Sequence, residues 1–149
     1  MATEALKELF TRDLLRLKKE IELYKTDENL WKIENSIKNS GGNLCLHLIG
    51  NLKTFIGNGL AQVGYVRQRE FEFAGKNVDR NTLYKQLDET IQIVNEGLSQ
   101  VTVKQLGENF PVKIWKEETG MVFTLIHLHS HLNYHRGQIN YHRRMLEKE

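Results

Sequence analysis

Cysteine and proline each occur only once in this chain of 149 residues, as Cys45 and Pro111. A single cysteine excludes an internal disulfide, which is typical of proteins of the reducing cytosol. Because proline interrupts helices most strongly, one proline leaves nearly the whole chain free to be helical. No stretch approaches the ~20 consecutive apolar residues that a membrane-spanning helix needs. We therefore expect a cytoplasmic protein with no part in a membrane.

The chain also has little excess charge of either sign. Its 21 basic and 19 acidic side chains leave a formal charge of +2, too little to indicate a nucleic-acid partner or an anionic membrane. The N-terminus carries acids early and lacks a basic segment followed by an apolar run, so we do not expect a signal peptide. The length and the 40% hydrophobic content suit one globular domain, which we place at residues 1–149.

Several functional motifs are absent as well. The chain has no Glu-x-x-His, which argues against a carboxylate-rich di-iron bundle. It has no H-E-x-x-H and no glycine-rich phosphate motif, which argues against a zincin and a nucleotide-binding protein. Cys45 lies in an apolar run with no adjacent base, so a cysteine nucleophile is not expected.

What the chain does have is helical periodicity. Apolar residues recur every three or four positions in four segments: residues 3–25, 43–60, 79–100 and 121–146. This spacing gives each helix one apolar face. Of the connectors, residues 26–42 have room for one helical turn, residues 64–79 should cross as a loop, and residues 101–120 should form a long loop or small hairpin. The pattern predicts an all-α four-helix bundle.

Five of the six histidines fall within the last predicted helix: His127, His129, His131, His135 and His142. At ~100° per residue, His131 and His135 lie within the apolar stripe and point inward. Residues four apart on a helix project the same way ~6 Å apart, so this pair could bind one divalent cation. His127 and His131 have the same spacing, and periodicity alone does not choose between the two pairs.

The remaining two of these histidines are expected at the surface or rim. His129 points to the far side of the helix from His131. His142 lies ~10 Å further along the axis than His135, too far to share its cation.

A third ligand would have to come from another helix. His47 is the only histidine outside the last helix, and it shares the apolar face of the second one. Three neutral imidazoles with an open position for water are typical of a catalytic rather than a structural divalent site. The alternative is that His47 only forms hydrogen bonds within the core.

The chain resembles a known family in two stretches, NSGGNLCLHLIGNL (residues 39–52) and HLHSHLNYHRGQINYHRR (residues 127–144). They resemble the DinB-like (DinB/YfiT) superfamily, in particular a branch with Y-H-x-G-Q-I in its last helix. The resemblance implies a bundle with a long crossover that is often a homodimer. It also implies a metal held by His47, His131 and His135, because the Arg-Gly-Gln after His135 aligns this residue as the second of its pair.

Two amides could support such a site. Gln138 and Asn51 lie on the inward faces near His135 and His47, where they could orient the ligands or a bound water. The alternative is that both are amides at the edge of the core.

Two arginines are candidates for substrate binding. Arg67 and Arg69 could hold an anionic substrate group at the mouth of a cleft. The alternative is that they pair with nearby acids such as Glu70 and Glu72, which contributes little to stability.

The leading interpretation is a metal-dependent enzyme. Ligation by imidazole alone suits zinc, nickel or iron. An open coordination position would activate water or a thiol, which suits a hydrolase or a thiol-dependent transferase acting on a small molecule. Some members of the family are thiol-dependent transferases or isomerases, so the resemblance makes a low-molecular-weight thiol a candidate partner. Two alternatives stay open: a non-catalytic metal- or ligand-binding module of a stress response, and a structural helical dimer whose inward histidines bind only one another.

Overall fold

The computed structural model describes residues 2–148, so the expected domain ends Met1 and Glu149 lie outside the described residues. Along these residues the elements are α1 (Ala2–Leu23), α2 (Asp27–Trp31), α3 (Gly41–Leu52), the π-helical η1 (Lys53–Ala61), α4 (Arg69–Ala74), α5 (Arg80–Ser99), the 3-10 turn η2 (Gln105–Gly107) and α6 (Met121–Glu147). No strand occurs among residues 2–148, where pairing is limited to one isolated bridge between Asn109 and Gly120. The all-α class is confirmed.

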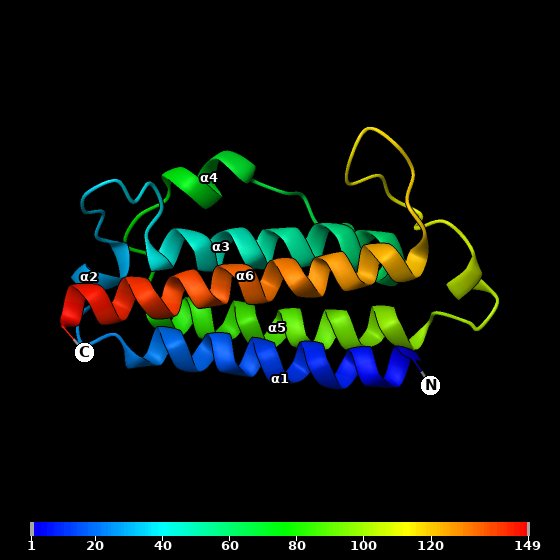
Figure 1. Ribbon diagram of the computed structural model, residues 1–149, viewed down its shortest axis with the longest axis horizontal. Coiled ribbons are helices and arrows are strands. Elements are labelled where there is room, and N and C mark those ends of the chain that lie inside the picture. The colour runs from blue at the N-terminus through cyan, green and yellow to red at the C-terminus, as the bar shows by residue number, and fades with distance from the viewer. Residues whose placement is uncertain (1, 149) are drawn as a thin grey trace.

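Four long helices lie side by side as a bundle (Figure 1). α1 packs against α5 and α6, while α3 packs against α6 and, through its continuation η1, against α5. Figure 1 shows α1 and α6 running in one direction and α3 and α5 in the other. Because α3 and α5 are parallel, the chain between them has to return along the bundle. That return is the expected long crossover.

The core is built from the apolar faces that the periodicity predicted. On α1, Phe10, Leu14 and Leu17 are fully buried, and on α5 so are Leu83 and Leu87. α3 differs, because all of its residues are buried. The bundle covers one side of α3, and α4 packs against it as well. A helix covered in this way can hold polar side chains in a protected position.

The crossover contains a helix that the sequence did not predict. Residues 64–79 were expected to be a loop, but Arg69–Ala74 form α4. The buried amide of Asn43 on α3 donates to the carbonyls of Glu72 (3.0 Å) and Gly75 (2.8 Å). These contacts with α3 fix the end of α4, and they are invisible to a search for local periodicity.

The other connectors agree with the expectation. α2 supplies the single helical turn between α1 and α3. Residues 101–120 form a long loop that contains only η2 and the one isolated bridge. None of the described helices is long and apolar enough to cross a lipid bilayer.

Candidate metal centre

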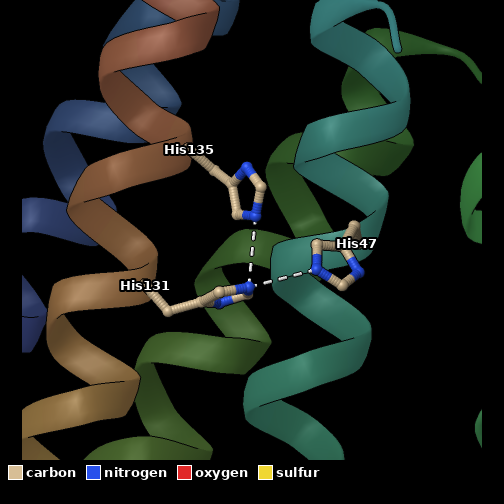
Figure 2. Close-up of side chains that lie close together, drawn as sticks. All are labelled: His47, His131 and His135. Carbon is tan, nitrogen blue, oxygen red and sulfur yellow. Dashed lines mark hydrogen bonds between the residues drawn. The ribbon is translucent and has the colours of Figure 1, made fainter. Parts of the chain in front are cut away.

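Three histidines from two helices meet on one side of the bundle. His47 comes from α3, and His131 and His135 come from successive turns of α6 (Figure 2). The Nε2 atom of His131 lies 3.2 Å from that of His47 and 3.1 Å from that of His135. Three nitrogens held ~2.0–2.1 Å from a tetrahedral zinc ion would be separated by roughly 3.3 Å. The spacing of the imidazoles is therefore of the size that one ion requires.

The cluster is buried on one side and accessible on the other. His47 is 7% exposed, whereas His131 and His135 are half-buried. The ring of Phe73 on α4 lies 4.9 Å from the ring of His47 and covers part of it. A ligand from solvent can thus reach the cluster from the side of α6, while the protein surrounds the ring on α3.

Glu72 of α4 holds the ring of His47. Its Oε1 atom lies 3.0 Å from Nδ1 of His47, and the residue is only 4% exposed. Arg67 donates to both oxygens of this carboxylate, at 2.8 Å from Nε and 2.9 Å from Nη2. A carboxylate paired in this way accepts a hydrogen bond from the N–H group at Nδ1. The lone pair of the imidazole is then on Nε2, which points at the cluster.

Gly50 makes room for this carboxylate. A Cβ atom at Gly50 would lie 2.0 Å from Oε2 of Glu72, so any larger residue at this position would displace the side chain. The sequence analysis considered Glu72 only as a partner for arginine and missed its contact with His47. The signal that could have indicated it is weak: a glycine one turn after an inward histidine, in an otherwise good helix.

Gln138 holds the ring of His135 in the same way. Its Oε1 atom lies 2.7 Å from Nδ1 of His135, and its amide nitrogen donates to the hydroxyl of Tyr134 at 3.3 Å. Because an amide oxygen only accepts, Nδ1 of His135 carries the proton. Nε2 of His135 therefore also presents a lone pair to the cluster.

All three imidazoles are held in their neutral form. Burial lowers the pKa of His47 and of His135. Burial and the neighbouring histidines lower the pKa of His131 to about 3. Neutral imidazole is the form that binds a metal ion.

The hydrogen-bond pattern fits a cation better than a proton. His47 and His135 both direct lone pairs at Nε2 of His131, which can carry a single proton and donate it to one of them. The Nδ1 atom of His131 is buried without a hydrogen-bond partner in the described part of the chain, so this ring, unlike those of His47 and His135, has no acceptor that fixes its tautomer. One divalent ion among the three Nε2 atoms would satisfy all three lone pairs at once.

The other candidate residues are placed as follows. Asn51 is 7% exposed, and its Oδ1 atom has no hydrogen-bond partner among the described residues. Arg67 pairs with Glu72, as the alternative interpretation had it. Arg69 is exposed, with its guanidinium carbon 5.7 Å from the centre of the Phe73 ring.

His127 lies next to the cluster but outside it. Its ring stacks on His131 with centres 6.2 Å apart and contacts Trp115 edge-on at 4.5 Å. The group whose ligand atoms all lie within 4.8 Å of one another consists of His47, His131 and His135. Of the two equally spaced pairs on α6, it is His131 and His135 that face α3.

The expectation of a surface or rim position was wrong for His142, whereas His129 is only partly buried. His142 is 4% exposed, with Nδ1 2.7 Å from the hydroxyl of Tyr24 and Nε2 2.8 Å from the carbonyl of Lys32. His129 binds the fully buried carboxylate of Asp13 at 2.7 Å. The connector after α1 covers His142, and α1 covers part of His129. The periodicity of α6 alone does not reveal contacts with other segments.

These features define a class of protein, an all-α bundle with a three-histidine cluster on one side. The sequence matches a family described as a protein of unknown function (DUF1572) over residues 4–149, and the chain belongs to this family. A conserved protein from Enterococcus faecalis, solved as a crystal structure, is 18% identical with a TM-score of 0.77 over 99% of this chain and 98% of that chain, so the two share a fold. No curated protein matches.

Proposed function

We propose that the protein is a DinB-like metalloprotein that binds one divalent transition metal ion through the Nε2 atoms of His47, His131 and His135. The observation that carries the proposal is the convergence of these atoms at 3.1–3.2 Å from two separate helices. The orientation of two of the rings by Glu72 and Gln138 supports it, because metal-binding histidines typically donate their other nitrogen to such an acceptor.

Zinc, nickel or iron fits this set of ligands best. Imidazole binds these ions well, whereas magnesium and calcium prefer oxygen ligands. A metal with three protein ligands and an open position supplies Lewis-acid chemistry or an activated water or thiol. We propose a hydrolase or thiol-dependent transferase that acts on a small molecule, with a low-molecular-weight thiol as the candidate co-substrate.

A non-catalytic metal- or ligand-binding module is the second candidate. One observation favours it: the acid that touches the cluster, Glu72, is already bound to Arg67 and is not free to move protons. A screen of small thiols and electrophiles with the metal-loaded protein separates the two. Turnover that disappears in His47→Ala supports an enzyme. No turnover with any combination of thiol and electrophile supports a non-catalytic binding module.

The resemblance also implies a homodimer, and we propose one; we propose a cytoplasmic location as well, because a single cysteine is typical of proteins of the reducing cytosol. The exposed side chains of Val122, Phe123 and Ile126 at the start of α6 offer an apolar surface to a second copy. Light scattering of wild type and Phe123→Glu tests the dimer, since the variant should be monomeric.

The test of the metal site is the metal content of the purified protein. We expect one ion per chain in wild type and nearly none in His131→Ala. His127→Ala is the matched control, because His127 lies one turn away on the same helix and outside the cluster. Full metal content in His131→Ala would contradict the proposal.

A further inference from the structure

A cavity of about 390 Å³ is lined by Gln138, the residue that contacts His135, although none of the three clustered histidines lines it. Leu44, one turn before His47 on α3, and Gln138, one turn after His135 on α6, both line it. Because α3 and α6 run in opposite directions, these two positions lie toward the same end of the bundle (Figure 1). The cavity therefore begins about one helical turn, ~5.4 Å, from the metal ligands.

Gln138 connects the cavity to the cluster directly. Its side chain lines the cavity and also lies 2.7 Å from Nδ1 of His135. A molecule that contacts Gln138 would therefore touch the residue that orients a metal ligand. This is the position expected of a substrate, whose reacting end must come close to the metal.

The walls of the cavity are largely apolar. Ile37 from the connector, Leu44 from α3, and Tyr141 and Met145 from α6 line it. Tyr141 and Met145 are 64% and 66% exposed, so large apolar surface is left in contact with water around it. The volume lies at the lower end of the ~300–1,000 Å³ of typical small-molecule sites. The shape and lining suit the body of a small apolar molecule.

One charged side chain lines the cavity, that of Lys38. It is exposed and has no ion pair among the described residues, and no acidic side chain lines the cavity there. Arg144 does not line the cavity, although its guanidinium lies 5.7 Å from the ring centre of Tyr141. The polar side chains of Ser36 and Asn39 also line the cavity, and the ammonium of Lys38 is the charged group that could select a ligand by its charge.

Both ring nitrogens of His142, which also lines the cavity, are already bound to Tyr24 and to the carbonyl of Lys32. Burial lowers the pKa of His142, and the carboxylates of Glu147 and Glu34 act against this larger effect of burial.

We propose that this cavity binds a small carboxylate with an apolar body, held at its anionic end by Lys38 and directed at its other end toward Gln138 and His135. That this molecule is the substrate of the metal centre rests on the proposed function. Binding to the cavity itself does not, since Lys38 and the apolar walls are present without a metal.

Three probes with one apolar body test the charge preference: 3-phenylpropionate, 3-phenylpropanol and 3-phenylpropylamine. Each is titrated into the metal-free protein by calorimetry and by NMR, so that the carboxylate cannot simply bind a metal. We expect the acid to bind about tenfold more tightly than the alcohol and the amine, as one charge-assisted contact would give. The side-chain amide signal of Gln138 should shift on binding.

Two variants and a control locate the site. Lys38→Met should abolish the advantage of the acid, and Ile37→Trp, which fills the cavity, should weaken all three probes. Lys76→Met removes an exposed lysine that does not line the cavity and should change nothing. Lys38→Met and Ile37→Trp alter the surface of the connector rather than the core. A melting curve of each variant checks that it folds.

Equal affinity for the three probes, or binding of the acid that survives both variants, would overturn the proposal. Metal content is measured separately, on the protein as purified and before any metal is removed. Binding that depends on Lys38, in a protein that is purified without metal, supports the cavity site and contradicts the metal proposal. One metal per chain without binding in the cavity does the reverse.

Discussion

The carboxylate of Glu72 lies 3.0 Å from Nδ1 of His47, although the two residues are 25 positions apart and come from α4, within the crossover, and from α3. α4 brings Glu72 there, and Gly50 leaves the space for it. This contact fixes which nitrogen of His47 faces the other two imidazoles, so it decides whether the cluster can bind a metal.

Glu72→Gln should weaken zinc binding about 10- to 100-fold, the usual effect of losing a residue that orients a metal ligand. The amide keeps the shape of the side chain and can still accept a hydrogen bond from Nδ1 of His47. The amide lacks the negative charge that strengthens this bond and makes the imidazole a better metal ligand. Competition with a chromophoric chelator measures the affinity. Glu70→Gln, an exposed change in the same helix, is the control. Equal affinities in the two variants would show that the charge of Glu72 plays no part in metal binding.

Gly50→Ala should destabilise the metal-free protein by roughly 1–3 kcal/mol, because the new methyl group would overlap the carboxylate of Glu72. Gly137→Ala is the matched control: a Cβ there meets nothing within 4 Å, so the better helix former should stabilise by ~0.5–1 kcal/mol. Urea unfolding measures both. A stabilising Gly50→Ala would mean that Glu72 does not need the space.

Zinc affinity should fall as the pH is lowered, because a protonated imidazole cannot bind the ion. Burial lowers the pKa of His47 and of His135, and burial together with the neighbouring histidines lowers that of His131 to about 3. The decline should therefore begin below the ~6.5 of an exposed histidine. Calorimetric titrations between about pH 7 and pH 4 follow it. A decline centred above pH 6.5 would contradict the neutral, buried state of the rings.

Asp13 should make the fold sensitive to acid. Burial acts to raise the pKa of this carboxyl, but hydrogen bonds from Arg12, Asn133 and His129 outweigh burial and lower the pKa far below its usual range. A lowered pKa stabilises the fold above the unfolded value of ~3.9, and this contribution is lost as the pH falls toward the folded value. Asp13→Asn should therefore cost roughly 3 kcal/mol at pH 7 and less at pH 3.

Urea unfolding of the metal-free protein at several pH values measures this difference. Asp88→Asn is the control, because the carboxylate of Asp88 is largely exposed and its pair with Lys18 should contribute little. A destabilisation by Asp13→Asn that is the same at pH 3 and pH 7 would show that the carboxylate charge plays no part.

Periodicity predicted the four long helices and the inward direction of His131 and His135, because both depend on spacing within one helix. It did not predict α4 or the contact of Glu72 with His47, because these depend on packing between segments that are distant in sequence. The environments of His129 and His142 were missed for a related reason. Spacing shows which way a side chain points, but not which other segment covers it.

The most direct test of the three-histidine site is X-ray absorption spectroscopy of the zinc-loaded protein. We predict three imidazole ligands at ~2.0–2.1 Å and one further light atom in wild type, with one imidazole fewer in His47→Ala. A zinc ion with fewer than three imidazoles in wild type, or a spectrum that His47→Ala leaves unchanged, would contradict a site shared by α3 and α6.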